Sequence, residues 1–199
     1  MKSDELQIYI SIVAIIALFL FPWAQITMSF FGSTASQDLH TTKIKSSLSG
    51  GIFSDFQGEE VRSYNEYRLA YEGRDEKSLR NETGIILYLI RNFPYMELFS
   101  YALMLLFGVL ILFDNRSYYF IPGVLLTVYS GYFFFVLSNG LSYLDYTYPV
   151  DYLLTGAVIS NGDMVLKMGL GWYLAFFTGI VAMIYSIQKP RRKYRFFKN

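Results

Sequence analysis

Few side chains in this sequence could carry out covalent or proton-transfer chemistry. The chain of 199 residues contains no Cys and one His, His40. Thiol catalysis, thiolate metal sites and iron–sulfur clusters need Cys, and a haem held by paired His or a multi-histidine metal site needs more than one His. We therefore expect no catalytic residue, no metal and no cofactor, and we expect that the protein is not an enzyme.

Acidic residues occur in adjacent pairs, Glu59 with Glu60 and Asp75 with Glu76. Acid–base catalysis needs carboxylates whose pKa values are shifted by shared burial. Both pairs lie in polar, charged stretches, which are typical of a solvated surface. Asn81 begins the tripeptide NET, a glycosylation acceptor pattern that also arises by chance, so its modification is left open.

The composition indicates a solvent other than water. Hydrophobic residues make up 53% of the chain and charged residues 17%, against about 25% charged residues in soluble globular proteins. Aromatic residues reach 19%, with 18 Tyr and 18 Phe, and aromatic rings gather at membrane–water interfaces. The composition therefore predicts a membrane protein.

Four apolar segments are long enough to cross a membrane as helices, since about 20 apolar residues cover about 30 Å of hydrocarbon. The first follows a short polar start, as a cleaved signal peptide would, but its apolar run exceeds the roughly 7 to 15 residues of a signal, which favours a retained helix. We predict one integral membrane domain over residues 1–199, mainly α: a four-transmembrane-helix bundle with a small extracytoplasmic β-containing loop domain at residues 29–92. The predicted helices are residues 7–28, 94–113, 118–137 and 168–187.

A cluster of basic residues in the tail, residues 188–199, predicts the orientation. Basic residues beside a span stay on the cytoplasmic side, so we expect both termini in the cytoplasm and the loops 29–92 and 138–166 outside a cell membrane. A docking site for anionic lipid or nucleic acid is the alternative, but a topology signal accounts for the position of these charges directly after a span. The residues are Lys189, Arg191, Arg192, Lys193, Arg195 and Lys198.

Short elements are expected in the first loop. Residues 44–48, IKSSL, read as a strand, whereas residues 67–72, YRLAYE, fit a strand or a helical face. Residues 84–93 form either a strand or an outward extension of the second helix. The residue before a proline is pushed toward extended geometry, and Pro94 follows directly, so we favour the strand.

Small residues recur at four-residue steps in the third and fourth predicted helices, and small side chains let helices approach closely in lipid. We therefore expect these two helices to pack as an antiparallel pair. The residues are Gly123, Thr127 and Gly131 in the third helix, and Gly171, Ala175 and Gly179 in the fourth.

Glu97 is the one acidic residue inside a predicted helix, near its outer end. A charge at the bilayer centre is costly, so such residues often mark transport or ligand sites. The shallow depth of Glu97 favours an interfacial polar pair with Lys167 at the start of the fourth helix.

Two short motifs accompany the layout of helices and loops. Pro22 and Trp23 end the first helix, and the last helix opens with GLGWYLAFFTGI from Gly169. With these motifs the chain resembles small prokaryotic tetraspan membrane proteins of uncharacterised function with claudin-like organisation. The resemblance implies a left-handed four-helix bundle bearing a small outer sheet, and an adhesion, scaffold or accessory role. The claudin loop signature of Trp, Gly-Leu-Trp and two Cys is absent, so paracellular sealing is not predicted.

We expect a non-catalytic interaction, scaffold or accessory subunit that acts through its extracytoplasmic loops. Its partners would be membrane lipids and other membrane or extracytoplasmic proteins, or a second copy, and not nucleic acid. Tyr64, Tyr67 and Tyr71 suit a contact patch, because Tyr gives a large contact area at low entropic cost, but they suit the core of the loop domain equally well. The alternative is a small transporter or channel component that uses Glu97.

Overall fold

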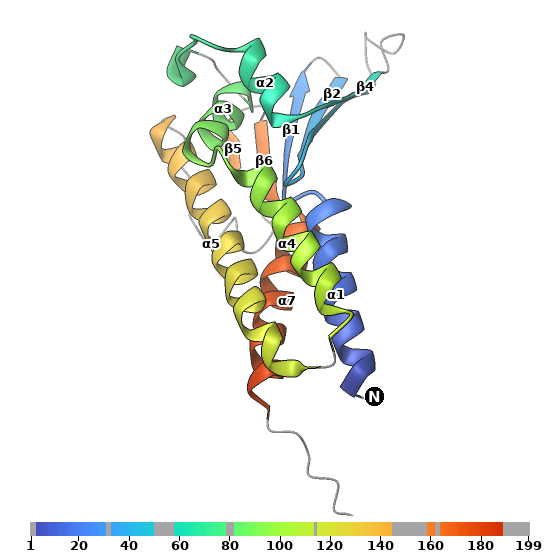
Figure 1. Ribbon diagram of the computed structural model, residues 1–199. Helices are drawn as coiled ribbons and strands as arrows, with labels where there is room; N and C mark the ends of the chain where they lie inside the picture. Colours follow the sequence, from blue (N-terminus) through green and yellow to red (C-terminus); the bar gives the residue numbers. More distant parts are fainter. Residues whose placement is uncertain are drawn as a thin grey trace, which may run out of the picture.

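The computed structural model describes residues 3–30, 33–49, 58–78, 82–113, 115–144, 159–161 and 164–188. The chain forms two parts (Figure 1). The helical part consists of α1 (Ser3–Phe19), α4 (Met96–Leu110), α5 (Phe120–Tyr143) and α7 (Leu170–Ile187). The sheet module, at one end of these helices, consists of an antiparallel sheet with the helices α2 (Tyr64–Ala70) and α3 (Glu82–Asn92) beside it.

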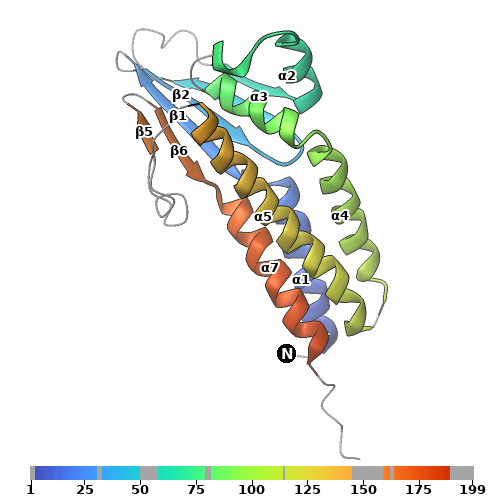
Figure 2. The ribbon, with the colours of Figure 1, turned by 90° about the vertical axis from the view of Figure 1, so that its left-hand side faces the viewer.

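Around the bundle, the four helices follow one another in the order α5, α7, α1, α4. Helix α5 contacts α7, α7 contacts α1, and α1 contacts α4, whereas the contact between α4 and α5 is sparser. Figure 2 shows α4 standing apart from α5 along most of its length. Side chains bridge the space between these two helices, because the Tyr129 hydroxyl of α5 donates a hydrogen bond of 2.9 Å to the carbonyl of Met96 in α4.

The prediction of a four-transmembrane-helix bundle is wrong. In the part of the chain that the structure describes, two helices are long and apolar enough to cross a membrane, Arg116–Tyr143 and Leu170–Ile187. Helix α1 has 17 residues, and α4 has 15. Helix α4 follows α3 after a bend of 64°. The two helices together would make a third span if the bent pair is counted as a single segment.

The predicted first helix, residues 7–28, was too long because Pro22 and Trp23 interrupt it. A proline lacks the backbone N–H that a helix needs and clashes with the preceding turn. The chain leaves the helix after Phe19 and enters the strand β1 (Ala24–Phe30). An apolar run that looked like one span is therefore divided between a helix and the sheet.

The sheet has six strands in the order β4-β3-β2-β1-β6-β5, and every neighbouring pair is antiparallel. Strand β1 lies in the middle and pairs with β2 on one side and β6 on the other, so the sheet joins the two loops that were predicted separately. The remaining strands are β2 (Ser33–Leu39), β3 (Ile44–Ser49), β4 (Gly58–Arg62), β5 (Ile159–Asn161) and β6 (Met164–Met168).

One face of the sheet is apolar and buried, and we call it the inner face. Successive side chains of a strand point to opposite faces. Two pairs of neighbouring residues on this face are almost completely buried from solvent: Ile26 with Leu166, and Leu39 with Ile44. Both views show α2 and α3 beside the sheet (Figures 1 and 2). The alternation of apolar and polar residues along each strand thus places the core of the sheet module between strands and helices.

Two segments of the first loop were predicted in more than one form. Residues 44–48 lie in β3, so this strand is confirmed. Residues 67–72 belong largely to α2, whose start carries a capping box between Ser63 and Glu66. Residues 84–93 are not a strand, because α3 runs to Asn92. The restriction imposed by Pro94 falls on Phe93 alone, so the helix persists up to that residue and then bends.

Trp23 joins the helical part to the sheet module. Its side chain is fully buried, its indole Nε1 donates a hydrogen bond of 2.8 Å to the carbonyl of Ala17, and its backbone N donates one of 2.7 Å to Leu39. The rings of Tyr129 and Phe133 meet it edge-on, with centroids 5.2 and 5.3 Å away. The side chain and the backbone of this one residue therefore fix α1, α5 and the sheet to each other.

Candidate functional site

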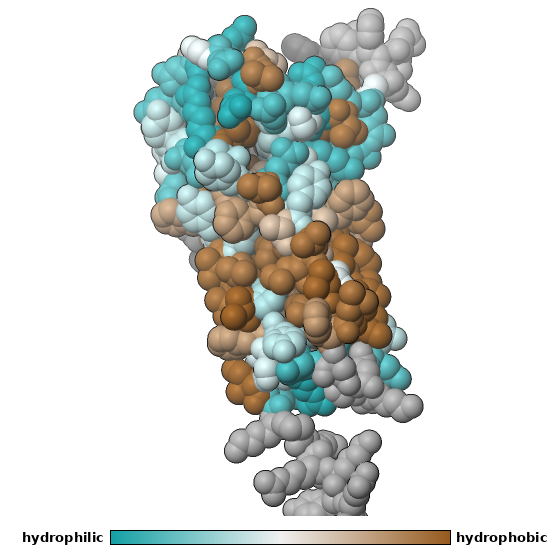
Figure 3. All heavy atoms as spheres, in the orientation of Figure 1, coloured by the Kyte–Doolittle hydropathy of each residue, from teal (hydrophilic) through white to brown (hydrophobic). Residues whose placement is uncertain are grey.

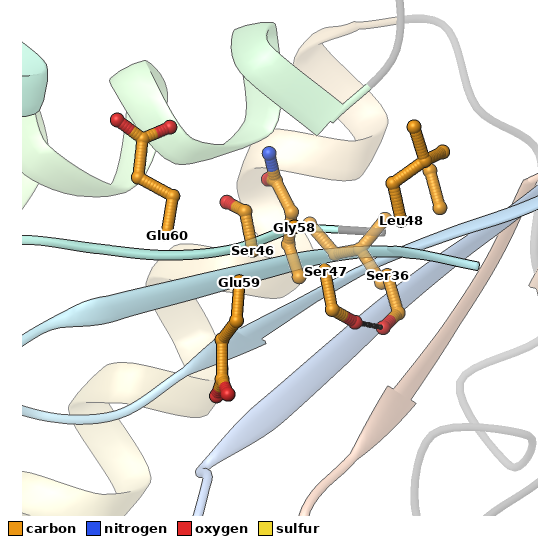
Figure 4. A pocket seen from close by; sticks show the side chains of 10 residues that line it. Ser36, Ser46, Ser47, Leu48, Gly58, Glu59 and Glu60 are labelled. Carbon is orange, nitrogen blue, oxygen red and sulfur yellow. Dashed lines mark hydrogen bonds between the residues drawn. The ribbon is translucent and has the colours of Figure 1, made fainter. Parts of the chain in front are cut away.

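A cavity of about 440 Å³ lies over the β4 side of the sheet (Figure 4). This volume falls within the range of about 300 to 1,000 Å³ that is usual for ligand pockets. The residues that shape its inner surface come from four neighbouring strands, and we call it the edge pocket. They include Ile26, Ala35, Gln37, Ser46, Leu48 and Glu60.

The register of the sheet places these residues on one face. Ile26 pairs with Gln37, Gln37 with Ser46, and Ser46 with Glu60, so the four form one row across β1 to β4. In Figure 4 the side chains of Ser46, Leu48 and Glu60 point to one side of the strands, whereas those of Ser36, Ser47 and Glu59 point to the other. The edge pocket therefore opens over the inner face, where the helices do not cover it completely.

The edge pocket has acceptors in the Gln37 amide oxygen and the Glu60 carboxylate, beside possible donors in the Ser46 hydroxyl and the Gln37 amide nitrogen. Gln37 Oε1 is buried and has no hydrogen-bond partner, which is costly unless a ligand or water supplies a donor. Glu60 Oε1 accepts a hydrogen bond of 2.7 Å from Arg62 Nε, and this bond raises the pKa of the Arg62 guanidinium. The Glu60 side chain is 58% exposed, so its carboxylate remains accessible at the mouth.

In the described part of the chain, strand β4 forms one edge of the sheet, because it pairs there with β3 alone. Its residues from Gly58 to Val61 are exposed. On the outer face Glu59 makes an ion pair with Lys45. Gly58 has no side chain and lines the edge pocket, so at this position no side chain of β4 itself stands between the pocket and the strand edge.

The three tyrosines proposed as a contact patch lie mostly in the core. Tyr64 and Tyr67 are only 5% and 4% exposed, and the Tyr64 hydroxyl donates a hydrogen bond to the carbonyl of His40. Tyr71 is half-buried, and its ring lies 5.1 Å from that of Tyr67. A partner cannot reach Tyr64 or Tyr67, so the structure corrects the contact patch in favour of the core.

Glu97 and Lys167 lie apart. Glu97 is in the first turn of α4 and lines a small hollow with Tyr64 and Arg68. Lys167 is exposed in β6, opposite Gln25 and thus on the outer face of the sheet. No ion pair joins them in the part of the chain that is described, because Lys167 lies in the strand β6 and not, as predicted, at the start of the last helix.

The small residues of α5 and α7 are brought together only in part. A Cβ atom on Gly123 would lie 2.8 Å from the carbonyl O of Gly179, which shows that the two backbones touch there. Gly171 packs instead against Phe21 O and Trp23, whereas a Cβ on Gly131 would have no neighbour within 4 Å. Thr127 contacts Gly179, and Ala175 is fully buried.

Several predicted features lie outside the described residues. These are the glycosylation candidate Asn81, most of the loop 138–166, and the basic tail residues Lys189, Arg191, Arg192, Lys193, Arg195 and Lys198.

The single histidine has a structural position. His40 lies in the β2–β3 hairpin, is 5% exposed and has no hydrogen-bond partner at Nδ1. Burial lowers the pKa of His40, and the nearby Lys43 lowers it further. The neighbouring Thr41 donates a hydrogen bond of 2.6 Å to the carbonyl of Leu18 at the end of α1. This hairpin therefore rests on the first helix.

Sequence reasoning missed the residues of the edge pocket. Glu59 and Glu60 were predicted to be solvated, and they are 54 and 58% exposed, but neither they nor Gln37 and Ser46 were predicted to line a pocket. The available signal was weak. Ser46 lies two residues after the buried Ile44, and Gln37 two residues before the buried Leu39, so both lie on the inner face. Polar residues at core positions of a strand indicate either a water or a ligand site.

No family model matches the chain, and no curated protein matches its sequence.

Proposed function

We propose that the chain is a membrane-embedded, non-catalytic interaction protein, an accessory or scaffold subunit whose binding part is the sheet module. The observation that carries this proposal is the separation of the two parts. Hydrophobic residues cover the helical part, and hydrophilic residues gather on the sheet module (Figure 3). Two helices of the helical part are long and apolar enough to cross a membrane. A hydrophilic module at the end of such helices is the surface that remains available to partners in water.

The sheet module is well suited to binding because its surface is fixed from several directions. The β ladders fix the strands, Tyr64 ties α2 to the β2–β3 hairpin, and Trp23 ties the sheet to the helices. Sites on rigid elements hold a binding surface with little loss of entropy. The edge pocket and the exposed strand β4 lie on this fixed frame.

We further propose a cell membrane location, with both termini in the cytoplasm and the sheet module outside. Helix α1 begins and α7 ends at the end of the helical part that lies away from the sheet module (Figure 1). Six basic residues follow α7 in the sequence, which supports a cytoplasmic position for that end. The relationship to claudin-like membrane proteins stays a prediction.

Single cysteines in this Cys-free chain test the orientation. Glu72→Cys lies in the sheet module and Ser117→Cys at the opposite end of the helices, and both positions are exposed. An impermeant thiol reagent should label Glu72→Cys in intact cells and Ser117→Cys only after permeabilisation. The reverse pattern would place the sheet module inside and contradict the proposal.

Purification in mild detergent tests the interaction role. We expect a second protein, or a second copy, to be recovered at a fixed stoichiometry, and we expect Glu60→Lys to reduce this recovery. Glu72→Lys is the matched control, because Glu72 is exposed in the same module but away from the edge pocket. A chain that remains a lone species at all protein concentrations would exclude the accessory role.

A further inference from the structure

We propose that strand β4 and the edge pocket form one binding site for an extended, lysine-bearing peptide segment of a partner protein, which adds to the sheet as a further strand. This inference rests on the proposed function, because it takes the sheet module as the binding part. The peptide backbone would pair with β4, and its inner-face lysines would enter the edge pocket.

The backbone of β4 is available for pairing. It is hydrogen-bonded to β3 on one side, and its residues from Gly58 to Val61 are exposed. An edge strand presents a row of backbone N–H and C=O groups on its other side. An extended peptide can pair with such a row at the ordinary strand spacing of about 4.8 Å.

The edge pocket gives the added strand a place for its side chains. Every second side chain of a strand points to the same face, so those on the inner face would lie next to Gly58 and Glu60, which border the pocket. Ile26, Ala35 and Leu48 provide apolar surface inside. That surface suits the aliphatic stem of a lysine, which is commonly buried while its ammonium group keeps polar partners.

The acceptors in and around the pocket favour an ammonium group over a neutral side chain. Gln37 Oε1 is buried without a donor, and the Glu60 carboxylate is 58% exposed at the mouth. A lysine ammonium has three donors and no acceptor, so it can bind the exposed Glu60 carboxylate and still has donors for other acceptors of the pocket. The described lining of the pocket offers it no buried cation that would repel it.

The ion pairs already present at the edge do not prevent this binding. Glu60 pairs with Arg62 and Glu59 with Lys45, and the four side chains are 40 to 58% exposed. Ion pairs between exposed side chains contribute little, because water screens them and their side chains lose entropy. The carboxylates can therefore exchange partners. Without a peptide, the same charges would protect the edge from uncontrolled pairing.

The test uses the full chain in lipid nanodiscs and a dye-labelled peptide of alternating lysine and threonine, acetylated and amidated, with binding measured by fluorescence anisotropy. We expect saturable binding. Glu60→Gln removes a charged acceptor, and Ser46→Leu fills the pocket, so each should weaken binding roughly tenfold. Glu72→Gln should bind like the wild type. Unchanged unfolding midpoints would show that the variants remain folded, and the surface change Glu60→Gln alone suffices if Ser46→Leu does not fold.

Two further peptides separate the parts of the proposal. A peptide with every amide nitrogen methylated keeps its charges but has no backbone N–H for pairing on either edge, and it should not bind. A peptide with norleucine in place of lysine keeps the stems but lacks the ammonium groups, and it should bind at least roughly tenfold more weakly. Equal binding of the methylated peptide, or wild-type binding by Glu60→Gln, would overturn the proposal.

The outcome is distinguishable from that of the proposed function. If the lysine peptide does not bind but a partner is still recovered from cells, the peptide site is wrong and the interaction role stands. If the peptide binds as described and no partner is recovered, the site stands and the accessory role falls.

Discussion

Gly179 sets the distance between α5 and α7. A Cβ atom at this position would lie 2.8 Å from the carbonyl O of Gly123 and 3.0 Å from the backbone N of Thr127. Backbone atoms cannot swing aside as the end of a flexible side chain can. The two helices can therefore approach this closely only because residue 179 is a glycine, which has a hydrogen atom where alanine has a methyl group.

We predict that Gly179→Ala lowers the free energy of unfolding in detergent by about 1–3 kcal/mol, because the helices must move apart to admit the methyl group. Gly131→Ala is the matched control on α5, where an added Cβ meets nothing within 4 Å. Alanine is a better helix former than glycine by about 0.5–1 kcal/mol, so this control should be neutral or stabilising. Equal destabilisation by both changes would mean that the interface is not where the structure puts it.

His40 should make the sheet module sensitive to acid. Burial, followed by the charge of Lys43, lowers its pKa below the ordinary 6.5, so below that pH the unfolded chain binds a proton that the folded chain resists. The contribution to stability is thus complete above 6.5 and is lost as the pH falls toward the lower pKa of the folded state. The charge of Asp38 raises the pKa of His40 and so opposes this shift, and the charge of Lys45 lowers it.

The measurement compares the wild type with His40→Gln, using the unfolding midpoint at several values between about pH 7.5 and 5. We expect the midpoint of the wild type to fall more steeply, because glutamine does not titrate. Parallel curves for the two proteins would show that His40 does not couple to folding.

Single residues were the hardest features to predict from the sequence. The stripe of Gly171, Ala175 and Gly179 is regular, yet Gly171 contacts the segment after α1 and Gly179 contacts α5. Spacing along a helix identifies a face, but it does not identify the neighbour. The three tyrosines show the same limit, because buried and partner-facing tyrosines have the same chemistry.

The 3-10 helix η2 (Glu76–Ser78) is held to α3 by an ion pair. Glu76 Oε1 lies 2.6 Å from Arg91 Nη1, and the Glu76 side chain is 9% exposed. Arg91 Nη2 also donates a hydrogen bond of 2.6 Å to the carbonyl of Arg74. The Arg91 guanidinium of α3 therefore fixes the segment from Arg74 to Glu76, which precedes α3 in the chain.

We predict that Arg91→Met destabilises the chain by about 1–3 kcal/mol, less than a fully buried pair would, because Arg91 is partly exposed. Glu76→Gln should cost less, since the Arg91 charge that it leaves without a carboxylate is 43% exposed and can be hydrated, whereas Arg91→Met leaves a nearly buried carboxylate. The double variant should be more stable than Arg91→Met alone, and thermal unfolding in detergent measures all three. A double variant as unstable as the sum of the single changes would show that the two side chains are not coupled.

Elements with a clear period were predictable, and those with a continuous apolar run were not. In α3 the residues Ile85, Ile86, Leu87, Leu89 and Ile90 are all buried, so no polar face reveals a helix, and the run reads equally well as a central strand. In β1 the polar residues Gln25, Thr27 and Ser29 alternate with apolar ones, but no polar residue separates the end of α1 from Ala24, so the sequence was read as one continuous span. Only the pairing with β2 and β6 decides that Ala24–Phe30 is extended.

At the scale of the whole molecule, the two parts meet at a joint made by two separate segments. Gly169 N donates a hydrogen bond of 2.9 Å to Trp23 O, and Gly171 N donates one of 2.9 Å to Pro22 O. A Cβ atom on Gly169 would lie 2.7 Å from the carbonyl carbon of Pro22. The connection from β6 to α7 is thus pressed against the connection from α1 to β1.

We predict that Gly169→Ala loosens this joint and lowers the free energy of unfolding by about 1–3 kcal/mol. The chain has two Trp residues, Trp23 and Trp172, and both are buried near the joint. Their fluorescence therefore reports the joint directly, and its emission should shift to longer wavelength in the variant. Gly108→Ala is the control, because an added Cβ there meets nothing within 4 Å. An unchanged emission spectrum in Gly169→Ala would contradict the prediction.

The central position of β1 has a consequence for biosynthesis. Its partner β2 follows at once, but its other partner β6 comes near the end of the chain. During translation, before β6 has been synthesised, one side of β1 has no strand to pair with. Unpaired strand edges of this kind can pair with strands of other chains. The sheet can close only after α5 has been made and the chain has returned to the same side of the helices. A chain stopped before residue 164 would therefore keep β1 exposed and depend on a chaperone or a protease.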